Sequence, residues 1–363
     1  MTAELSQFAE RLRLNGARQV PDIPDDHFNA LALELFGLQF KHNAAYRKIC
    51  EARRVTPETV EHWTQVPFVP TPTFKELELS AIPSEQRSAV FHSSGTTEQR
   101  PSRHFHCAES LKIYEASLWL WFQENIPGSE IRDSLRHLPD YDLVVLTPPP
   151  CSVPNSSLVH MFETVRERLG APESVFVGVP DANGAWVLNF DAALEVLNDG
   201  QRPKLVLGTA FSFVHLLDFL GERNIRLWLR AGSRVMETGG YKNRSRTMPK
   251  AELHSLVTER LGVSRDDIIC EYGMSELSSQ AYDANAGRRF RFPPWARAQV
   301  ISPETGRAAA YGETGLIRIF DLANVFSVAA IQTEDLAVRQ RDGFELVGRV
   351  AVSEPRGCSL MTA

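Results

Sequence analysis

The chain has 363 residues, of which 43% are hydrophobic and 23% are charged, and this ordinary globular composition excludes disordered and fibrous proteins. Its 39 Lys and Arg residues against 45 Asp and Glu residues give a formal net charge of −6, so charge provides no reason to expect nucleic-acid binding. The five cysteines are scattered and never spaced as CxxC, which argues against disulfides and a structural zinc site.

Two features of the sequence bear on its compartment. The N-terminal residues have neither the basic start nor the apolar stretch of a signal peptide. The most apolar long stretch, residues 205–220, contains His215 and Asp218 and is too short to span a bilayer. We therefore expect a cytoplasmic protein without a membrane span.

The first part of the chain shows the spacing of helices. Leu5, Phe8 and Leu12 share one helical face, and a similar pattern recurs between residues 28 and 36. The segment VPFVPTP at 66–72 carries three prolines and cannot be a central strand or a helix, so it reads as a connection. We assign residues 1–66 to a helical segment that packs on the core.

Short apolar runs then alternate with helical patterns. This alternation predicts an α/β core with a largely parallel sheet, which we place at residues 67–291. The predicted strands are 142–147, 174–179, 204–209 and 233–237, and the predicted helices include 156–169, 211–222 and 250–261.

The chain changes character near Phe292. Turn signals at 304–306 and 342–343 separate strand-like runs, so we expect a β-rich subdomain over 292–349 and a mobile tail over 350–363. The strands predicted in this subdomain are 298–301, 316–320, 325–331 and 344–347.

A hydroxyl-rich segment is the first candidate for chemistry. A glycine among hydroxyls allows close approach of a phosphate, and successive N–H groups there can form an anion-binding nest. The GK[ST] ending of a Walker A loop is missing, and the composition also fits a surface turn. The candidate phosphate-binding residues are Ser93, Ser94, Gly95, Thr96 and Thr97.

A second candidate segment follows the apolar pair at 268–269. An aromatic ring, a glycine, a hydroxyl and a carboxylate at a strand end can stack on a base, admit a ribose and bind Mg²⁺, which prefers oxygen ligands. A strand end with a chance acidic residue is the alternative interpretation. The candidates are Tyr272, Gly273, Met274, Ser275 and Glu276, with Glu276 as the Mg²⁺ ligand.

Two weaker segments complete the set. Gly239 and Gly240 follow a predicted strand and permit unusual backbone angles, and Lys242 comes shortly after them. Asp335 can accept hydrogen bonds from two ribose hydroxyls. A turn explains each of these segments equally well when it is considered alone.

In this order and approximate spacing, the segments resemble the adenylate-forming (ANL) superfamily of acyl-CoA synthetases, adenylation domains and luciferase-like ligases. The chain is most similar to the LuxE-type acyl-protein synthetases of bacterial bioluminescence, mainly through its overall length and the ending RGCSL at 356–360. The resemblance runs from about Pro67 to the C-terminus and includes the GETG sequence at 312–315. It implies a large domain of parallel-rich sheets flanked by helices, followed by a β-rich part.

The resemblance also implies an ATP site with Mg²⁺. The 93–97 loop would line the β- and γ-phosphates, Glu276 would bind Mg²⁺, and Ser275 would lie near the α-phosphate. The adenine and the ribose would be held by residues from three further segments. They are Gly239, Gly240 and Tyr272 beside the adenine, Asp335 on the ribose hydroxyls, and Arg349 at the hinge that ends the large domain.

The chain departs from the family pattern at three points. Glu98 stands where the loop usually has glycine, and Glu334 replaces the glycine between Thr333 and Asp335. An acidic side chain beside phosphates repels them unless it points away. Fourteen residues follow Arg349, and no lysine occurs after position 250, so we expect the usual small C-terminal lysine domain to be absent. Lys242 and Lys75 are candidates to replace its charge at the α-phosphate.

Cys358 is the candidate nucleophile. Thioester formation needs a thiolate that can reach the active site, and this cysteine lies in a polar tail between Arg356–Gly357 and Ser359. In the LuxE branch a cysteine in this tail receives the acyl group. The other four cysteines have more apolar or strand-like surroundings, so we expect them to be buried core residues.

The resemblance implies a two-step ligase. A carboxylic acid of the fatty-acid type is activated by ATP to an acyl-adenylate and then transferred to Cys358, for delivery to a reductase of the LuxC type or to an acyltransferase. An acid ligase whose acceptor is CoA or an acyl carrier protein is one alternative. A non-catalytic nucleotide-binding partner subunit is another, and a cysteine hydrolase is disfavoured because no local Cys/His signature accompanies Cys358.

Overall fold

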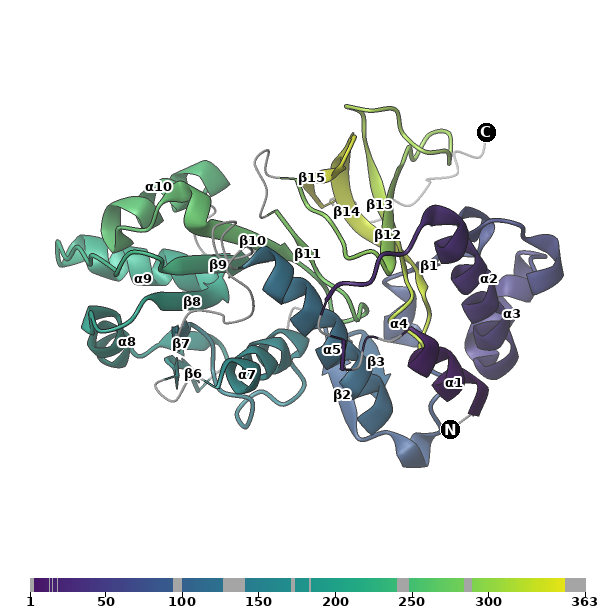
Figure 1. The fold of residues 1–363 in the computed structure, drawn as a ribbon, viewed down its shortest axis with the longest axis horizontal. Helices are drawn as coiled ribbons and strands as arrows, with labels where there is room; N and C mark the ends of the chain where they lie inside the picture. The colour runs from purple at the N-terminus through teal and green to yellow at the C-terminus, as the bar shows by residue number, and fades with distance from the viewer. Residues whose placement is uncertain are drawn as a thin grey trace, which may run out of the picture.

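The computed structural model is organised around two large β-sheets (Figure 1). The structure describes residues 3–12, 14, 16–17, 19–93, 100–126, 141–170, 174–182, 184–239, 248–283 and 289–349. The larger sheet has the strand order β11-β10-β9-β8-β4-β5, in which every neighbouring pair is parallel except β10 and β11. Its strands are β4 (Asp142–Val145), β5 (Val175–Phe176), β8 (Lys204–Thr209), β9 (Arg234–Thr238), β10 (Ile268–Tyr272) and β11 (Ala281–Tyr282).

Helices cover both faces of this larger sheet. Val206 and Val235 point to one face and pack against α8 (Phe190–Asn198), α9 (Ala210–Glu222) and α10 (Lys250–Leu261). Met236 belongs to the other face, which is covered by α5 (Ala108–Asn125) and α7 (Ser157–Leu169). Because both faces are buried, the strands are almost continuously apolar, as in β8.

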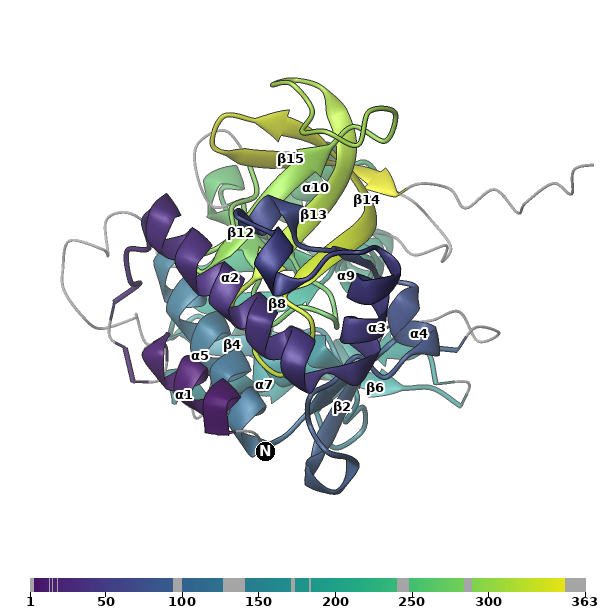
Figure 2. The same ribbon diagram turned by 90° about the vertical axis from the view of Figure 1, so that its right-hand side faces the viewer.

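The second sheet has five strands and is antiparallel apart from the pairing of β1 with β14. Figure 2 shows α2 and α3 in front of it. Phe28 of α2 makes an edge-to-face contact with Phe320, with ring centroids 6.1 Å apart. The elements are β1 (Val69–Pro70), β12 (Ala296–Ile301), β13 (Thr314–Asp321), β14 (Ala330–Gln340), β15 (Gly343–Arg349), α1 (Ala3–Arg11), α2 (Asp25–His42) and α3 (Ala44–Ala52).

Short elements link the two sheets. The hairpin β2–β3 is the one that matters for function, since it brackets the hydroxyl-rich segment. The short elements are η1 (Pro57–Thr59), η2 (Trp63–Gln65), α4 (Thr73–Glu76), η3 (Ser84–Gln86), β2 (Ala89–His92), β3 (Arg103–His106), β6 (Gly178–Pro180), β7 (Trp186–Leu188) and η4 (Arg265–Asp267).

Most predicted elements are confirmed, and two are wrong. The strand at 204–209 and the helix at 250–261 match β8 and α10 residue for residue. Residues 325–329 are not a strand: they form buried turns, and β14 begins at Ala330 and continues to Gln340. The run predicted at 174–179 is divided between β5 and β6, which belong to different sheets.

No described helix is both long enough and apolar enough to cross a membrane, as expected from the sequence.

A single buried glutamine holds the turns at 324–329 against α2. The Gln39 side chain donates hydrogen bonds to the carbonyls of Asn324 (2.8 Å) and Val325 (3.2 Å) and accepts one from the N–H of Ala329 (3.0 Å). Gln39 is 1% exposed, so water cannot replace these bonds. The amide explains why an apolar run here folds as turns: its backbone groups have partners outside any sheet.

We predict that Gln39→Leu destabilises the protein by about 3 kcal/mol, because three buried backbone groups lose their partners. Chemical denaturation of the variant and of the exposed control Gln86→Leu measures this. Equal stabilities for the two variants would contradict the structural role of Gln39.

Candidate functional site

The site is built on the carboxyl ends of β9 and β10. These strands are parallel, with Glu271 opposite Thr238, so Gly239 and Gly273 leave the sheet at the same edge. Gly239 has φ of +73°, a left-handed conformation that side chains disfavour. In open parallel sheets, ligands bind in the crevice outside this edge. Two of the predicted segments therefore meet where a ligand site is expected.

The carboxylate of Glu276 lies at the centre of this region and is 4% exposed. The hydroxyl of Ser102 donates to its Oε1 (2.5 Å), and the hydroxyl of Ser275 donates to its Oε2 (3.0 Å). The Asn324 side chain donates to the Glu276 carbonyl (2.8 Å). A carboxylate flanked by two hydroxyl oxygens is an all-oxygen set of the kind that Mg²⁺ prefers, so these residues fit the predicted ion.

The hairpin β2–β3 brings the start of the hydroxyl-rich segment to the same carboxylate. Ser93 and Ser102 are joined twice, since the N–H of Ser93 donates to the carbonyl of Ser102 (3.2 Å) and the N–H of Ser102 donates to Oγ of Ser93 (3.0 Å). Ser102 in turn bonds Glu276. Ser93 and Ser102 are thus both linked to Glu276 through hydrogen bonds.

His104 supports the backbone behind Glu276. Its Nδ1 lies 2.8 Å from the carbonyl of Ser275, and because a carbonyl can only accept, Nδ1 carries the proton. Burial lowers the pKa of His104 to about 4, so the imidazole stays neutral at pH 7. We assign His104 a positioning role.

Asp335 gathers the other predicted residues. The hydroxyl of Tyr272 donates to its Oδ2 (2.8 Å), and Nε of Arg349 donates to its Oδ1 (2.7 Å). The hydroxyl of Thr333 accepts from the N–H of Asp335 (3.1 Å). Asp335 is 7% exposed and an ionised carboxylate has about four acceptor positions, so two remain for ribose hydroxyls.

Glu271 lies beneath the strand end and explains one glycine. A Cβ at Gly273 would lie 2.4 Å from Oε1 of Glu271, so a side chain cannot be added there without displacing the carboxyl. The hydroxyl of Thr238 donates to Oε2 of Glu271. Burial raises the pKa of Glu271 to about 7.

Several predicted residues fall outside the described part of the chain. Lys75 is described and is half-buried on α4, and Met274 is half-buried against the core that includes the N-terminal helices. The residues outside the description are Ser94, Gly95, Thr96, Thr97, Gly240, Lys242 and Cys358.

Sequence reasoning missed Ser102, His104, Glu271 and Asn324. Ser102 follows the hydroxyl-rich residues 93–97 closely in sequence, but its role depends on a hairpin that brings it to a residue 174 positions away. One prediction about cysteines is wrong: Cys50, Cys107 and Cys270 are buried as expected, whereas Cys151 is exposed. The short proline-rich segment before Cys151 ends in turns on the surface instead of extending β4.

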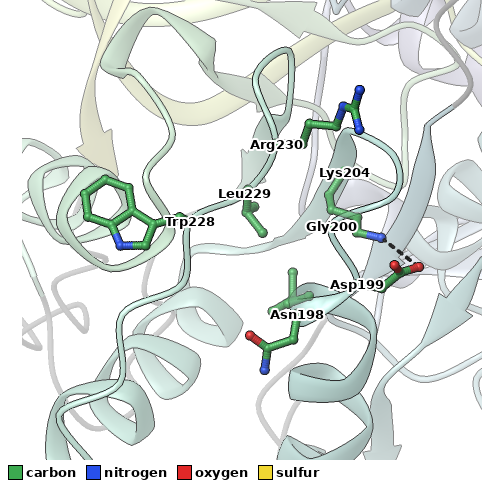
Figure 3. Close-up of a pocket in the computed structure, with 8 residues that line it drawn as sticks. Asn198, Asp199, Gly200, Lys204, Trp228, Leu229 and Arg230 are labelled. Atoms are coloured by element: carbon green, nitrogen blue, oxygen red, sulfur yellow. Dashed lines mark ion pairs between the residues drawn. The ribbon is translucent and has the colours of Figure 1, made fainter.

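A small pocket lies elsewhere, near the amino ends of the parallel strands (Figure 3). It is lined by Asp199, Lys204, Trp228 and Arg230 among others, and its cavity of about 40 Å³ has room for little more than a water molecule. Lys204 there pairs with the buried Asp142 at 2.6 Å. This pocket cannot hold a nucleotide and is separate from the carboxyl-end site.

Comparisons with known proteins identify the family of this chain. A family model described as "Acyl-protein synthetase, LuxE" matches residues 176–363, just over half of the chain. The long-chain-fatty-acid–luciferin-component ligase of Aliivibrio fischeri is 25% identical over 350 residues, which cover 92% of this chain and 87% of the relative.

Solved structures show the fold. An open conformation of 2-hydroxyisobutyryl-CoA ligase in complex with 2-HIB-AMP and CoA has a TM-score of 0.66 at 14% identity, covering 90% of this chain and 71% of the ligase. ATP-bound MatB from Rhodopseudomonas palustris has a TM-score of 0.50 at 15% identity, covering 96% and 72%. The α/β fold expected from the resemblance is confirmed.

The buried carboxyl of Glu271 makes stability depend on pH. Its folded pKa is about 7 against 4.5 when exposed, so the folded state holds this proton longer, and the resulting stability is present below pH 4.5 and lost as pH rises through 7. The side chain of Glu271→Gln stays neutral at every pH. We predict that its free energy of unfolding therefore falls by on the order of 3 kcal/mol less than that of wild type as pH rises.

Denaturation midpoints measured from pH 4.5 to 8 for wild type, Glu271→Gln and the exposed control Glu195→Gln test the prediction. The wild-type and Glu195→Gln curves should run parallel and the Glu271→Gln curve should be flatter. Three parallel curves would refute the raised pKa.

Proposed function

The chain belongs to the LuxE family of acyl-protein synthetases, and we propose that it activates a fatty-type carboxylic acid with ATP and transfers the acyl group to its own Cys358. The chain is an ATP-dependent, AMP-forming ligase by its family. The observation that carries the proposal is the convergence of Ser93, Ser102 and Glu276 at the edge where β9 and β10 end.

The first step is adenylation. A carboxylate oxygen of the acid attacks the α-phosphorus of ATP, the bond from that phosphorus to the bridging oxygen breaks, and pyrophosphate leaves. In the proposal residues 67–291 supply most of the nucleotide site: the 93–97 loop binds the β- and γ-phosphates, and Gly239, Gly240 and Tyr272 border the adenine. Asp335, in the β-rich 292–349 part, binds the ribose hydroxyls beside Arg349.

Glu276, Ser275 and Ser102 are the residues that would hold Mg²⁺. The bound ion would offset the negative charge of the phosphates during pyrophosphate departure. His104 is hydrogen-bonded to the carbonyl of Ser275, and Asn324 is hydrogen-bonded to that of Glu276. The backbone that carries these two side chains is therefore held in place before the nucleotide arrives. Gly273 and Met274 form the bend that leads to them. Lys242 is the candidate for the charge that most adenylating enzymes take from a C-terminal lysine.

The second step is thioester formation. The thiolate of Cys358 attacks the acyl carbonyl carbon, the bond from that carbon to the phosphate oxygen breaks, and AMP leaves with the electron pair. The thiol proton goes to solvent. The product is an acyl-S-enzyme on the 350–363 tail, which an acyl reductase or an acyltransferase can collect.

The setting we propose is the cytoplasm. The four cysteines among the described residues form no disulfide, which is typical of a reducing compartment. CoA or an acyl carrier protein as the acceptor is the competing candidate, and the test below distinguishes it.

We predict that intact wild-type protein gains the mass of an acyl group after incubation with Mg·ATP and a long-chain fatty acid, and that the adduct is released by hydroxylamine. Cys358→Ser should gain no such mass yet still release pyrophosphate, because adenylation precedes the thiol step. Cys151→Ser is the matched control, since Cys151 is an exposed cysteine to which the proposal gives no role.

Two outcomes would count against this proposal. Pyrophosphate release without an adduct on wild type would give the acceptor role to CoA or a carrier protein. Nucleotide binding without pyrophosphate release for any acid would favour a non-catalytic subunit.

We predict that Glu276→Gln lowers ATP–pyrophosphate exchange by roughly 100-fold, because one electrostatic contact to the transition state is typically worth about that much. Ser102→Ala should lower it by about tenfold, and the exposed control Glu195→Gln should leave it unchanged. Unfolding temperatures measured in parallel separate lost chemistry from lost folding. Full exchange activity in a folded Glu276→Gln variant would exclude Glu276 from the site.

A further inference from the structure

Three side chains of metal-binding type meet on the face of the larger sheet that α10 covers. Glu237 comes from β9, Cys270 from the adjacent β10 and His254 from α10, and their exposed fractions are 7%, 3% and 2%. One ligand atom from each lies within 4.8 Å of the other two. We propose that this cluster binds a divalent transition-metal ion, and that zinc is the ion it suits best.

The distances between the ligand atoms match a tetrahedral ion. Zinc bonds of about 2.0–2.3 Å at tetrahedral angles place neighbouring ligand atoms roughly 3.3–3.8 Å apart. His254 Nε2 lies 3.4 Å from Glu237 Oε1 and 3.6 Å from Cys270 Sγ, within that range. The third edge, from Cys270 Sγ to Glu237 Oε1, is 2.8 Å, so the thiol and the carboxylate would move apart by roughly 0.6 Å.

The charges of the cluster also match a divalent cation. A thiolate, a carboxylate and a neutral imidazole carry two negative charges in total, and binding releases the thiol proton to solvent. The ammonium of Lys250 contacts Cys270 and lies 2.7 Å from Oδ2 of Asp283, so the Asp283 carboxylate offsets its positive charge beside the sulfur ligand. The sulfur and imidazole ligands favour zinc over Mg²⁺ or Ca²⁺, which select oxygen.

The surroundings hold the ligands in place. Asp283 accepts a hydrogen bond from the N–H of Cys270 (2.7 Å), which fixes the backbone at the sulfur ligand. Val235 and Leu253, two residues before Glu237 and one before His254, are buried in the apolar core of this face. Three protein ligands leave the fourth position of a tetrahedral ion to water.

The role of such an ion would be structural. It would join β9, β10 and α10 one residue before Thr238 and Glu271, the positions from which the two strands lead into the site. The inference does not rest on the proposed acyl transfer, because metal content is measured without any activity. The sequence does not reveal the cluster, since its members are 17 and 16 positions apart and follow no short metal motif.

Metal analysis of the full-length, tag-free protein tests the proposal. Protein produced with zinc in the medium should contain one zinc ion per chain by mass spectrometry of the elements. After a chelator removes the zinc, titration with Co²⁺ should give the charge-transfer absorption of a thiolate–cobalt bond and the visible bands of a tetrahedral ion.

Variants locate the ion. Cys270→Ser should lose the thiolate–cobalt band, and His254→Gln should lose the bands of a tetrahedral ion. In both variants the affinity for cobalt should fall by more than roughly 100-fold, which is the upper loss seen when only a hydrogen-bond partner of a metal ligand is removed. Cys50→Ser, at an equally buried cysteine outside the cluster, should bind cobalt like wild type. If Cys270→Ser does not fold, His254→Gln and the wild-type spectrum decide.

Two results would overturn the proposal. Isolation of wild type with neither zinc nor a cobalt spectrum would leave a cluster held by hydrogen bonds alone. Alternatively, folded Cys270→Ser and His254→Gln could keep the wild-type spectrum, which would place the metal elsewhere.

Discussion

The register between β9 and β10 is the constraint on which the rest of the structure depends. Because Thr238 lies opposite Glu271, both strands end at one level of the sheet edge. Side chains alternate between the faces of a sheet, so a slip of one residue would exchange the faces of Glu237 and Thr238. The Thr238–Glu271 hydrogen bond and the Glu237–Cys270–His254 cluster would then be lost together, although they lie on opposite faces.

Glu276 extends this constraint to the second sheet. Its side chain bonds Ser102 beside the β2–β3 hairpin, and its carbonyl bonds Asn324, which belongs to the turns that Gln39 holds against α2. The N-terminal helices therefore support the site through two hydrogen-bonded steps. This explains how a site at the edge of one sheet can depend on an element packed against the other sheet.

Local signals in the sequence were sufficient for the elements and not for their meeting points. The strand β8 and the helix α10 could be predicted because the apolar pattern, the Thr209 cap of the next helix and the left-handed Gly262 mark their ends. The strand predicted at 325–329 is wrong because an apolar run is typical of a strand, whereas the hydrogen bonds from Gln39, which is distant in sequence, hold this run as turns. The motifs predicted Glu276 and Asp335. Asp335 pairs with Arg349, which is close in sequence. Glu276 pairs with Ser102, which is distant in sequence, so no local motif could reveal this contact.

The contact between Gly273 and Glu271 makes the residue that can stand at one of these positions depend on the residue at the other. A methyl group at 273 collides with the carboxyl at 271, and that carboxyl is enclosed and bonded to Thr238, so it has nowhere to retreat. A larger residue at 273 is compatible with the fold only beside a shorter residue at 271. A substitution at 273 is therefore accommodated only after residue 271 has become shorter, which makes the two positions an epistatic pair in which the order of substitutions matters.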